Sequence, residues 1–134
     1  MGVEIERKFL VDHALWHDVD KGMGTHYRQG YLLSDGRHTI RVRVSDTEGY
    51  LNMKSEVSSM VRKEYDYPIP LTDALEILDL FTKNGTEKMR YCIPFAGKIW
   101  EVDVFLGDNA GLIVAELELE DENEKFEIPA WVNT

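Results

Sequence analysis

The chain has 134 residues, of which 43% are hydrophobic and 30% are charged, and its formal net charge is −10. This length allows one domain with a hydrophobic core, and the composition excludes a wholly disordered chain. The negative charge argues against a nucleic-acid-coating surface, since such surfaces are basic, and no apolar run approaches the roughly 18 residues of a membrane span.

The first predicted strand, residues 4–10 (EIERKFL), alternates charged and apolar side chains. A strand sends successive side chains to opposite faces, so Glu4, Glu6 and Lys8 share one face and the apolar residues share the other. Two carboxylates at positions i and i+2 lie about 7 Å apart and repel by roughly 2 kcal/mol at an effective dielectric near 20. A solvated sheet face is the ordinary interpretation of alternation, but such faces usually mix Thr, Ser, Gln and Lys. The pattern therefore favours a face that binds ions.

The same alternation recurs along almost the whole chain. It covers the segments 41–43, 52–54, 62–66, 88–90, 101–105 and 116–120. Short turn signals rich in Gly, Asp and Asn separate these segments, as expected for an antiparallel meander. Because a charged sheet face must be enclosed, and because a barrel leaves no unpaired edges, we predict strands that close into a barrel with a charged lumen.

Helices are predicted between the strands. Thr72 is the expected N-cap of an amphipathic helix over residues 72–81, which the Asn84-Gly85 pair terminates. A shorter helix is predicted over residues 14–18 and a helical turn over residues 122–126. The surface available for the long helix consists of outward-facing strand residues, namely Ile5, Phe9, Val42, Val102 and Leu117. The predicted fold class is therefore α+β, with helices packed outside the barrel.

Charged pairs of opposite sign are predicted to share the lumen. The acidic pairs are Glu4/Glu6 and Glu116/Glu118, and the basic pairs are Arg41/Arg43 and Lys88/Arg90. Carboxylates suit a hard divalent cation, because Mg²⁺ is usually held by one or two carboxylates together with substrate phosphates. The planar fork of arginine matches phosphate oxygens, and lysine adds a point charge. The pattern indicates a site for a metal ion and a phosphate compound.

A single cysteine, Cys92, is present, so no intrachain disulfide can form. This agrees with a reducing compartment, and Cys92 is expected to be a small apolar residue rather than a nucleophile. We therefore expect a cytoplasmic protein with no nucleic-acid and no membrane partner. The chain is also a candidate homodimer.

Eight short motifs in a fixed order resemble those of the CYTH superfamily, the triphosphate tunnel metalloenzymes. They are residues 4–11 (EIERKFLV), 29–32 (QGYL), 41–43 (RVR), 54–56 (KSE), 62–65 (RKEY), 88–90 (KMR), 101–105 (EVDVF) and 116–118 (ELE). The chain is most similar to the bacterial short-chain inorganic triphosphatases of that superfamily. The resemblance runs from residue 2 to about Trp131, and it implies a closed or nearly closed antiparallel barrel of eight strands around a triphosphate tunnel.

The resemblance also implies roles for individual residues. The ligands of a Mg²⁺ or Mn²⁺ ion would be Glu4, Glu6, Glu116 and Glu118, with Asp103 and Glu101 as further ligands or as partners nearby. The residues that bind the triphosphate would be Lys8, Arg41, Arg43, Arg62, Lys88 and Arg90. Lys54, paired with Tyr31, would be the general base for the attacking water, because neighbouring Arg and Lys charges would favour the neutral amine.

The implied function is metal-dependent hydrolysis of inorganic triphosphate to pyrophosphate and phosphate. One alternative is a thiamine or nucleoside triphosphatase, in which Trp100 or Trp131 would stack on an organic group at a tunnel mouth, although such aromatic residues are more often core. Another is a class IV type adenylate cyclase, which usually replaces the segment 7–10 (RKFL). The non-enzymatic alternative is a catalytically impaired module that binds triphosphate or polyphosphate.

The C-terminus departs from the family pattern. Members usually continue beyond the Pro-x-Trp seen here at residues 129–131 with a helical tail that carries an Arg-x-Tyr-x-Asn pattern, and this chain stops at Thr134. We therefore expect a single CYTH-like domain over residues 1–134 that lacks the tail. Because the tail of family members packs against one tunnel end, its absence bears on tunnel closure, metal geometry and full activity, and it makes the binding-module alternative plausible.

Overall fold

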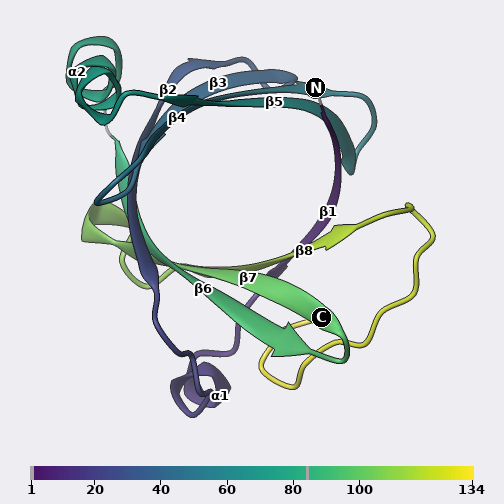
Figure 1. Cartoon of the computed structure of the whole chain (residues 1–134). Coiled ribbons are helices and arrows are strands. Elements are labelled where there is room, and N and C mark those ends of the chain that lie inside the picture. The colour runs from purple at the N-terminus through teal and green to yellow at the C-terminus, as the bar shows by residue number, and fades with distance from the viewer. Residues whose placement is uncertain (1, 84) are drawn as a thin grey trace.

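Strands form a closed barrel in the computed structural model, which describes residues 2–83 and 85–134 (Figure 1). The strands are β1 (Gly2–Leu10), β2 (Thr25–Ser34), β3 (His38–Val44), β4 (Gly49–Glu56), β5 (Val61–Ile69), β6 (Thr86–Phe95), β7 (Lys98–Leu106) and β8 (Ile113–Leu119). Around the barrel their order is β1-β5-β4-β3-β2-β6-β7-β8, and every pair is antiparallel. The predicted α+β fold with an eight-stranded antiparallel barrel is confirmed.

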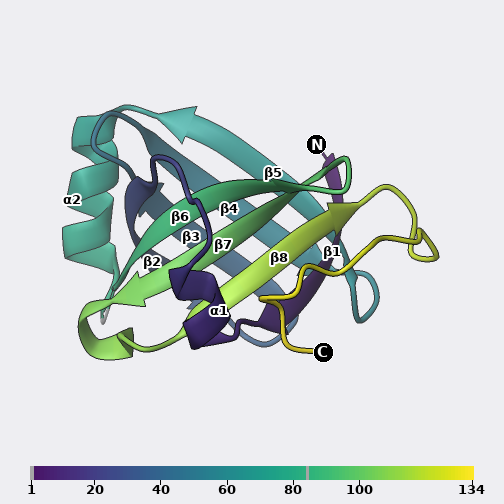
Figure 2. The same cartoon turned by 90° about the horizontal axis from the view of Figure 1, so that it is seen from below.

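Strand β1 closes the ring, because it pairs with β8 on one edge and with β5 on the other. Glu6 lies opposite Glu118 across the first pair, and Glu4 lies opposite Arg62 across the second. Directly paired residues point to the same face of a sheet, so these side chains share the lumen. Closure thus brings the first and last charged motifs of the chain side by side (Figure 2).

Helix α2 (Leu71–Phe81) lies outside the barrel and covers β3 and β4 (Figure 1). Its buried residues Ala74 and Leu78 pack against Val42 and Val44 of β3. These contacts bury part of the predicted apolar stripe, whereas its residues Leu75 and Phe81 are 40% and 67% exposed. Across the described residues, no helix combines the length and the apolar character that crossing a membrane requires.

The predicted start of α2 is wrong by two residues. The carbonyl of Pro70 accepts the first helical hydrogen bond, from Ala74 N at 2.9 Å, so Pro70 is the N-cap and Thr72 lies inside the first turn. A proline with φ of −54° enters a helix readily because its ring already holds a helical φ. The predicted terminator Asn84 lies outside the described residues, and the helix ends at Phe81.

Helix α1 (His13–His17) confirms the short predicted helix, and Asp12 caps it by accepting a hydrogen bond from Leu15 N at 3.0 Å. The predicted helical turn over residues 122–126 is not formed. Instead, Glu124 N donates to Asp121 O in a single turn, and the chain continues without regular structure. The chain then returns to β1, where Val11 and Val132 form an isolated bridge.

A second apolar core lies outside the barrel, on the side away from α2 (Figure 1). The ring centroids of Trp16 and Trp131 are 5.3 Å apart, and those of Trp100 and Trp131 are 6.1 Å apart. Ile5, Phe9, Val102 and Leu117 belong to this core, so of the surface predicted for the long helix only Val42 contacts α2. Trp100 and Trp131 are 0% and 7% exposed, so both are core residues, and neither lies at a tunnel mouth.

Candidate active site

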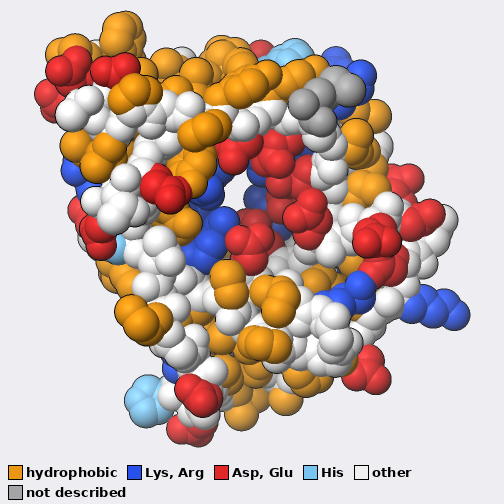
Figure 3. Space-filling view, in the orientation of Figure 1, with side chains coloured by type: hydrophobic (Ala, Val, Ile, Leu, Met, Phe, Trp, Pro, Cys, Tyr) orange, Lys and Arg blue, Asp and Glu red, His pale blue; other side chains and the backbone are white. Residues whose placement is uncertain are grey.

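A cavity of about 280 Å³ occupies the barrel lumen. Figure 3 looks along the barrel and shows Lys and Arg side chains on one side of the opening and Asp and Glu side chains on the other. The cavity is lined by Glu4, Glu6, Lys8, Tyr31, Thr39, Arg41, Arg43, Asn52, Lys54, Arg62, Glu64, Asp66, Lys88, Arg90, Glu101, Glu116 and Glu118. Every site residue predicted from the sequence is among them except Asp103.

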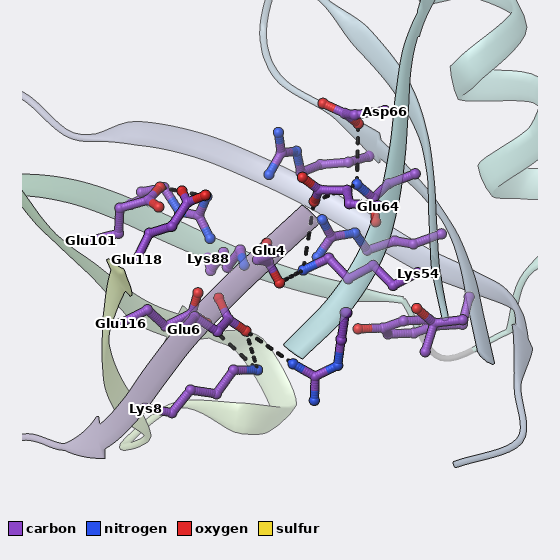
Figure 4. Close-up of a pocket in the computed structure, with 17 residues that line it drawn as sticks. Glu4, Glu6, Lys8, Lys54, Glu64, Asp66, Lys88, Glu101, Glu116 and Glu118 are labelled. Carbon is purple, nitrogen blue, oxygen red and sulfur yellow. Dashed lines mark hydrogen bonds and ion pairs between the residues drawn. The ribbon is translucent and has the colours of Figure 1, made fainter. Parts of the chain in front are cut away.

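The acidic wall comes from β1 and β8, with Glu101 of β7 beside it (Figure 4). Glu4 and Glu6 are each only 9% exposed. Burial, followed by the charges of Glu116 and Glu4, raises the pKa of Glu6 to about 7. Burial and the charges of Glu4, Glu64 and Glu101 also raise the pKa of Glu118. These carboxylates therefore repel one another when all are ionised, and a bound cation would stabilise their ionised forms.

Lysine and arginine side chains interrupt the acidic wall. Lys8 Nζ lies 3.5 Å from Glu6 Oε1 and 3.8 Å from Glu116 Oε1. Arg62 Nη1 is also 3.5 Å from Glu6 Oε1. The Lys8 side chain is 54% exposed, so this mixed cluster marks a mouth of the tunnel.

The predicted general base lies among carboxylates. Lys54 Nζ is 2.8 Å from Glu4 Oε1 and 3.8 Å from Glu64 Oε2 (Figure 4). The expectation that cations surround Lys54 is therefore wrong, because the strand order places its side chain against β1 and β5. Tyr31 lines the same cavity, but no hydrogen bond joins it to Lys54 among the described residues.

The basic wall contains Lys88 and Arg90 of β6, which share one buried partner, Asp103 of β7. Lys88 Nζ donates to Asp103 Oδ2 at 2.7 Å, and Arg90 donates from Nε to Oδ1 at 2.8 Å and from Nη2 to Oδ2 at 3.0 Å. Arg90 Nη1 is also 2.8 Å from Glu101 Oε2. Asp103 is 2% exposed and lies behind the two cations, so its contacts favour a partner role over that of a metal ligand.

Burial acts differently on the two ends of this ion pair. Burial lowers the pKa of Lys88 to about 8, although Asp103 opposes the effect. Burial alone would raise the pKa of Asp103, but the hydrogen bond and charge of Arg90 and the charge of Lys88 outweigh it and hold that pKa below its usual value. Lys88 and Arg90 thus have two carboxylate partners, Asp103 and Glu101, so a surplus of positive charge on the basic wall has to come from its other cations.

Arg41 and Arg43 of β3 complete the basic wall. Burial, together with the charges of Arg41 and Arg90, lowers the pKa of Arg43, so these cations repel one another. The Nε atoms of Arg41 and Arg43 are both buried and have no hydrogen-bond acceptor among the described residues. A buried unpaired donor costs about 1–3 kcal/mol, so an anion in the lumen would stabilise both side chains.

Four lining residues had no predicted role. Asn52 of β4 is 3% exposed, and its Nδ2 donates to Glu64 Oε2 at 3.1 Å and to Asp66 Oδ1 at 3.3 Å. The other three are these two acidic residues, Glu64 and Asp66 of β5, and Thr39 of β3. The alternation over residues 52–54 and 62–66 had already placed Asn52, Glu64 and Asp66 on the charged face, although it assigned them no role.

The chemistry of the acidic wall fits a hard divalent cation. Glu4, Glu6, Glu116 and Glu118 offer only carboxylate oxygens, which are the ligands that Mg²⁺ and Mn²⁺ prefer. Within residues 2–83 and 85–134, no three His, Cys, Asp or Glu side chains converge tightly enough to hold one ion as they stand. Oxygens of Glu4, Glu6 and Glu116 instead contact Lys8, Lys54 and Arg62, as described above.

Comparisons with known proteins agree with this geometry. The family model described as CYTH domain matches residues 2–134. An inorganic triphosphatase of Acetivibrio thermocellus is 47% identical over 133 residues, which are 98% of this chain and 84% of that protein. An inorganic triphosphatase of Nitrosomonas europaea is 34% identical over 132 residues, 96% of this chain and 85% of that protein.

A solved structure of an inorganic triphosphatase also resembles the barrel. It superimposes with a TM-score of 0.65 at 31% identity, and the match covers 100% of this chain and 86% of that one. The family model, the sequence relatives and this solved structure agree with one another. The chain therefore belongs to the CYTH domain family.

Proposed function

We propose that this protein hydrolyses inorganic triphosphate to pyrophosphate and phosphate inside the barrel lumen, with Mg²⁺ or Mn²⁺ as cofactor. The observation that carries the proposal is that Arg41 and Arg43 line the cavity opposite a wall of carboxylates, while no side-chain hydrogen bond or ion pair holds either guanidinium group among the described residues. The relatives described as inorganic triphosphatases support the same substrate.

The basic wall would bind the phosphoryl oxygens. Arg41 and Arg43 have donors to offer, and Lys88 and Arg90 are oriented by Asp103. Guanidinium groups pair with phosphate oxygens through two parallel N–H bonds, so the arginines would fix the orientation of the chain of phosphates. Lys8 and Arg62, at the mouth, would contact the part of the substrate farthest from this wall.

Glu4, Glu6, Glu116 and Glu118 would hold the metal ion, with Glu101 beside them. A bound divalent cation neutralises phosphate charge and polarises phosphoryl oxygens. Our interpretation of Asp103 is that it orients Lys88 and Arg90. This role can be distinguished from that of a metal ligand. Loss of a group that orients Lys88 and Arg90 should weaken triphosphate binding without changing the metal requirement.

Hydrolysis would proceed by attack of a water oxygen on a terminal phosphorus atom. The bond from that phosphorus to the bridging oxygen breaks, pyrophosphate leaves, and the proton of the water passes to a base. Lys54 stays our predicted base and Tyr31 its predicted partner. The base must be a neutral amine to accept this proton, and the carboxylates of Glu4 and Glu64 beside Lys54 do not provide the cationic surroundings that we expected.

The test is phosphate release from inorganic triphosphate, ATP and thiamine triphosphate, measured side by side with Mg²⁺, Mn²⁺ and excess chelator. We expect fast release from inorganic triphosphate only, and only with metal. Faster release from ATP or thiamine triphosphate would reassign the substrate, and formation of cyclic AMP would indicate a cyclase. Binding of triphosphate without any release would indicate the binding module.

Location and assembly stay predictions. We infer a cytoplasmic protein from the single cysteine, because the free thiol of Cys92 is exposed and would be kept reduced there. We also infer that residues 1–134 act as a single CYTH-like domain. Light scattering after size-exclusion chromatography would decide between a monomer and the candidate homodimer.

A further inference from the structure

Arg43 differs from the other cations of the basic wall in what holds it in place. Lys88 and Arg90 are held by the carboxylate of Asp103. The guanidinium carbon of Arg43 instead lies 4.5 Å from the ring centroid of Tyr27 and 5.4 Å from that of Tyr50. Both distances fall within the range of about 6 Å over which a ring face attracts a cation.

The strand order creates this arrangement. Arg43 is on β3, Tyr50 is its direct partner on β4, and Tyr27 is on β2 at the other side of β3. Tyr27 also lies 5.9 Å from the guanidinium carbon of Arg90. Neither tyrosine lines the lumen cavity, so both act on it through Arg43. The hydroxyl of Tyr50 donates to Glu48, which anchors that ring from outside.

Holding an arginine by ring faces has a chemical consequence. A carboxylate partner uses N–H donors and neutralises the charge, as Asp103 and Glu101 do with Arg90. An aromatic face attracts the cation through its quadrupole and accepts no conventional hydrogen bond, so the five N–H donors of the fork stay available. In agreement with this, no side-chain hydrogen bond or ion pair to Arg43 occurs among the described residues.

We propose that Tyr27 and Tyr50 are positioning residues, which hold Arg43 in place while leaving its donors free for a terminal phosphoryl group of the substrate. The inference rests on the proposed function, because it assigns Arg43 to a triphosphate. Tyr27 contributes more than Tyr50 to holding Arg43 in place, since its ring is closer to Arg43 and also contacts Arg90.

The test is the dissociation constant of inorganic triphosphate, measured by calorimetry with excess chelator so that no turnover occurs. We expect Tyr27→Leu to raise it about 5- to 30-fold, which is about 1–2 kcal/mol at 1.4 kcal/mol per factor of ten. Tyr27→Phe keeps the ring and should stay within about 2-fold of the wild type. The control Tyr67→Leu removes a half-exposed tyrosine on the outer face and should change nothing.

A double-mutant cycle separates positioning from general damage. In an Arg43→Gln background, Tyr27→Leu should raise the dissociation constant much less than it does in the wild type, because only the longer contact of Tyr27 with Arg90 remains. Equal effects of Tyr27→Leu in both backgrounds, or equal losses with Leu and Phe, would overturn the positioning role. A wild type that binds no triphosphate would contradict the proposed function itself. A wild type that binds triphosphate, with equal effects in the cycle, would contradict only the positioning role of the tyrosines.

A second measurement does not depend on the substrate. In a ¹H–¹⁵N spectrum, the Arg43 Nε–H signal, identified by its loss in Arg43→Lys, should be shifted by the ring currents of Tyr27 and Tyr50. We expect Tyr27→Leu to move this signal toward the position of a free arginine, and Tyr27→Phe to leave it in place. An Arg43 signal that ignores both substitutions would contradict the contact on which the proposal depends.

Discussion

Glu6 is the residue at which burial and charge conflict most directly. Its side chain is 7% exposed and its carboxyl pKa is raised from 4.5 to about 7, mainly by burial and then by Glu116 and Glu4. A carboxyl group with a raised pKa keeps its proton in the folded state while the unfolded chain releases it. Ionisation of Glu6 therefore does not lower the free energy of unfolding below pH 4.5, and it lowers it progressively as the pH rises to about 7.

We predict that Glu6→Gln stabilises the protein at pH 8 in the presence of chelator. The difference between 4.5 and about 7 corresponds to about 3 kcal/mol, which is the order of the expected gain. Unfolding in urea at pH 5 and pH 8 should show the gain only at pH 8. The exposed control Glu127→Gln should show no such difference. The same Glu6→Gln variant should need more metal for activity, and an unchanged metal titration would remove Glu6 from the ligand set.

Lys54 carries the second prediction at this scale. If it is the general base, Lys54→Ala should lower kcat by about 10²- to 10⁴-fold while metal-dependent binding of triphosphate stays nearly unchanged. Steady-state kinetics and calorimetry measure the two quantities. Lys63→Ala, an exposed lysine on the neighbouring strand β5, is the matched control. A parallel loss of binding and turnover would mean that Lys54 binds the substrate or orders Glu4 and Glu64 instead.

At the scale of elements, the docking of α2 on the barrel depends on Gly49, the first residue of β4. A Cβ atom added at Gly49 would lie 2.5 Å from Ala74 Cβ and 3.3 Å from the carbonyl oxygen of Ile69. Ala74 is fully buried in the core beneath α2, so the helix cannot avoid the added methyl group without moving away from β3 and β4.

We predict that Gly49→Ala lowers the free energy of unfolding by about 1–3 kcal/mol, the usual cost of overpacking a core. Gly2→Ala on β1 is the control, because its added Cβ would meet only one atom, Glu64 O, at an ordinary 3.7 Å. Chemical unfolding of both variants measures the difference. An unchanged stability of Gly49→Ala would mean that α2 is held loosely on the barrel.

At the scale of the whole molecule, the barrel encloses opposite charges that the chain carries far apart in sequence. The net charge is −10, yet the basic wall lies inside the lumen and faces its cavity. The closed ring of strands keeps these cations away from bulk water, which strengthens their attraction for an anion. An anion that enters should therefore stabilise the folded state as a whole.

We predict that inorganic triphosphate raises the melting temperature even with excess chelator. At a concentration of 100 times the dissociation constant, binding adds about 2.7 kcal/mol to the free energy of unfolding. The double variant Arg41→Gln, Arg43→Gln should lose this shift, and inorganic sulfate at matched ionic strength tests for a nonspecific salt effect. A shift that survives in the double variant would place the anion outside the lumen.

Much of the site was predictable because a strand has a period of two. Alternation in segments such as 4–10 and 116–120 identified the lumen-facing residues without knowledge of which strands are adjacent. The need to enclose these charged residues predicted a barrel. The order and spacing of these motifs predicted the family. Local pattern was weaker at helix ends, where Pro70 rather than Thr72 is the N-cap of α2.

Which lumen residues meet was decided only by tertiary structure. Alternation assigns a side chain to a face, but its partners depend on which strands are neighbours and how far they are staggered, and both follow from closure of the ring. Closure puts Asp103 behind Lys88 and Arg90, Lys54 between Glu4 and Glu64, and Arg43 beside two tyrosines. The sequence by itself determined the charged lumen and its chemistry, whereas pairing between strands distant in sequence decided which charges remain free for a ligand.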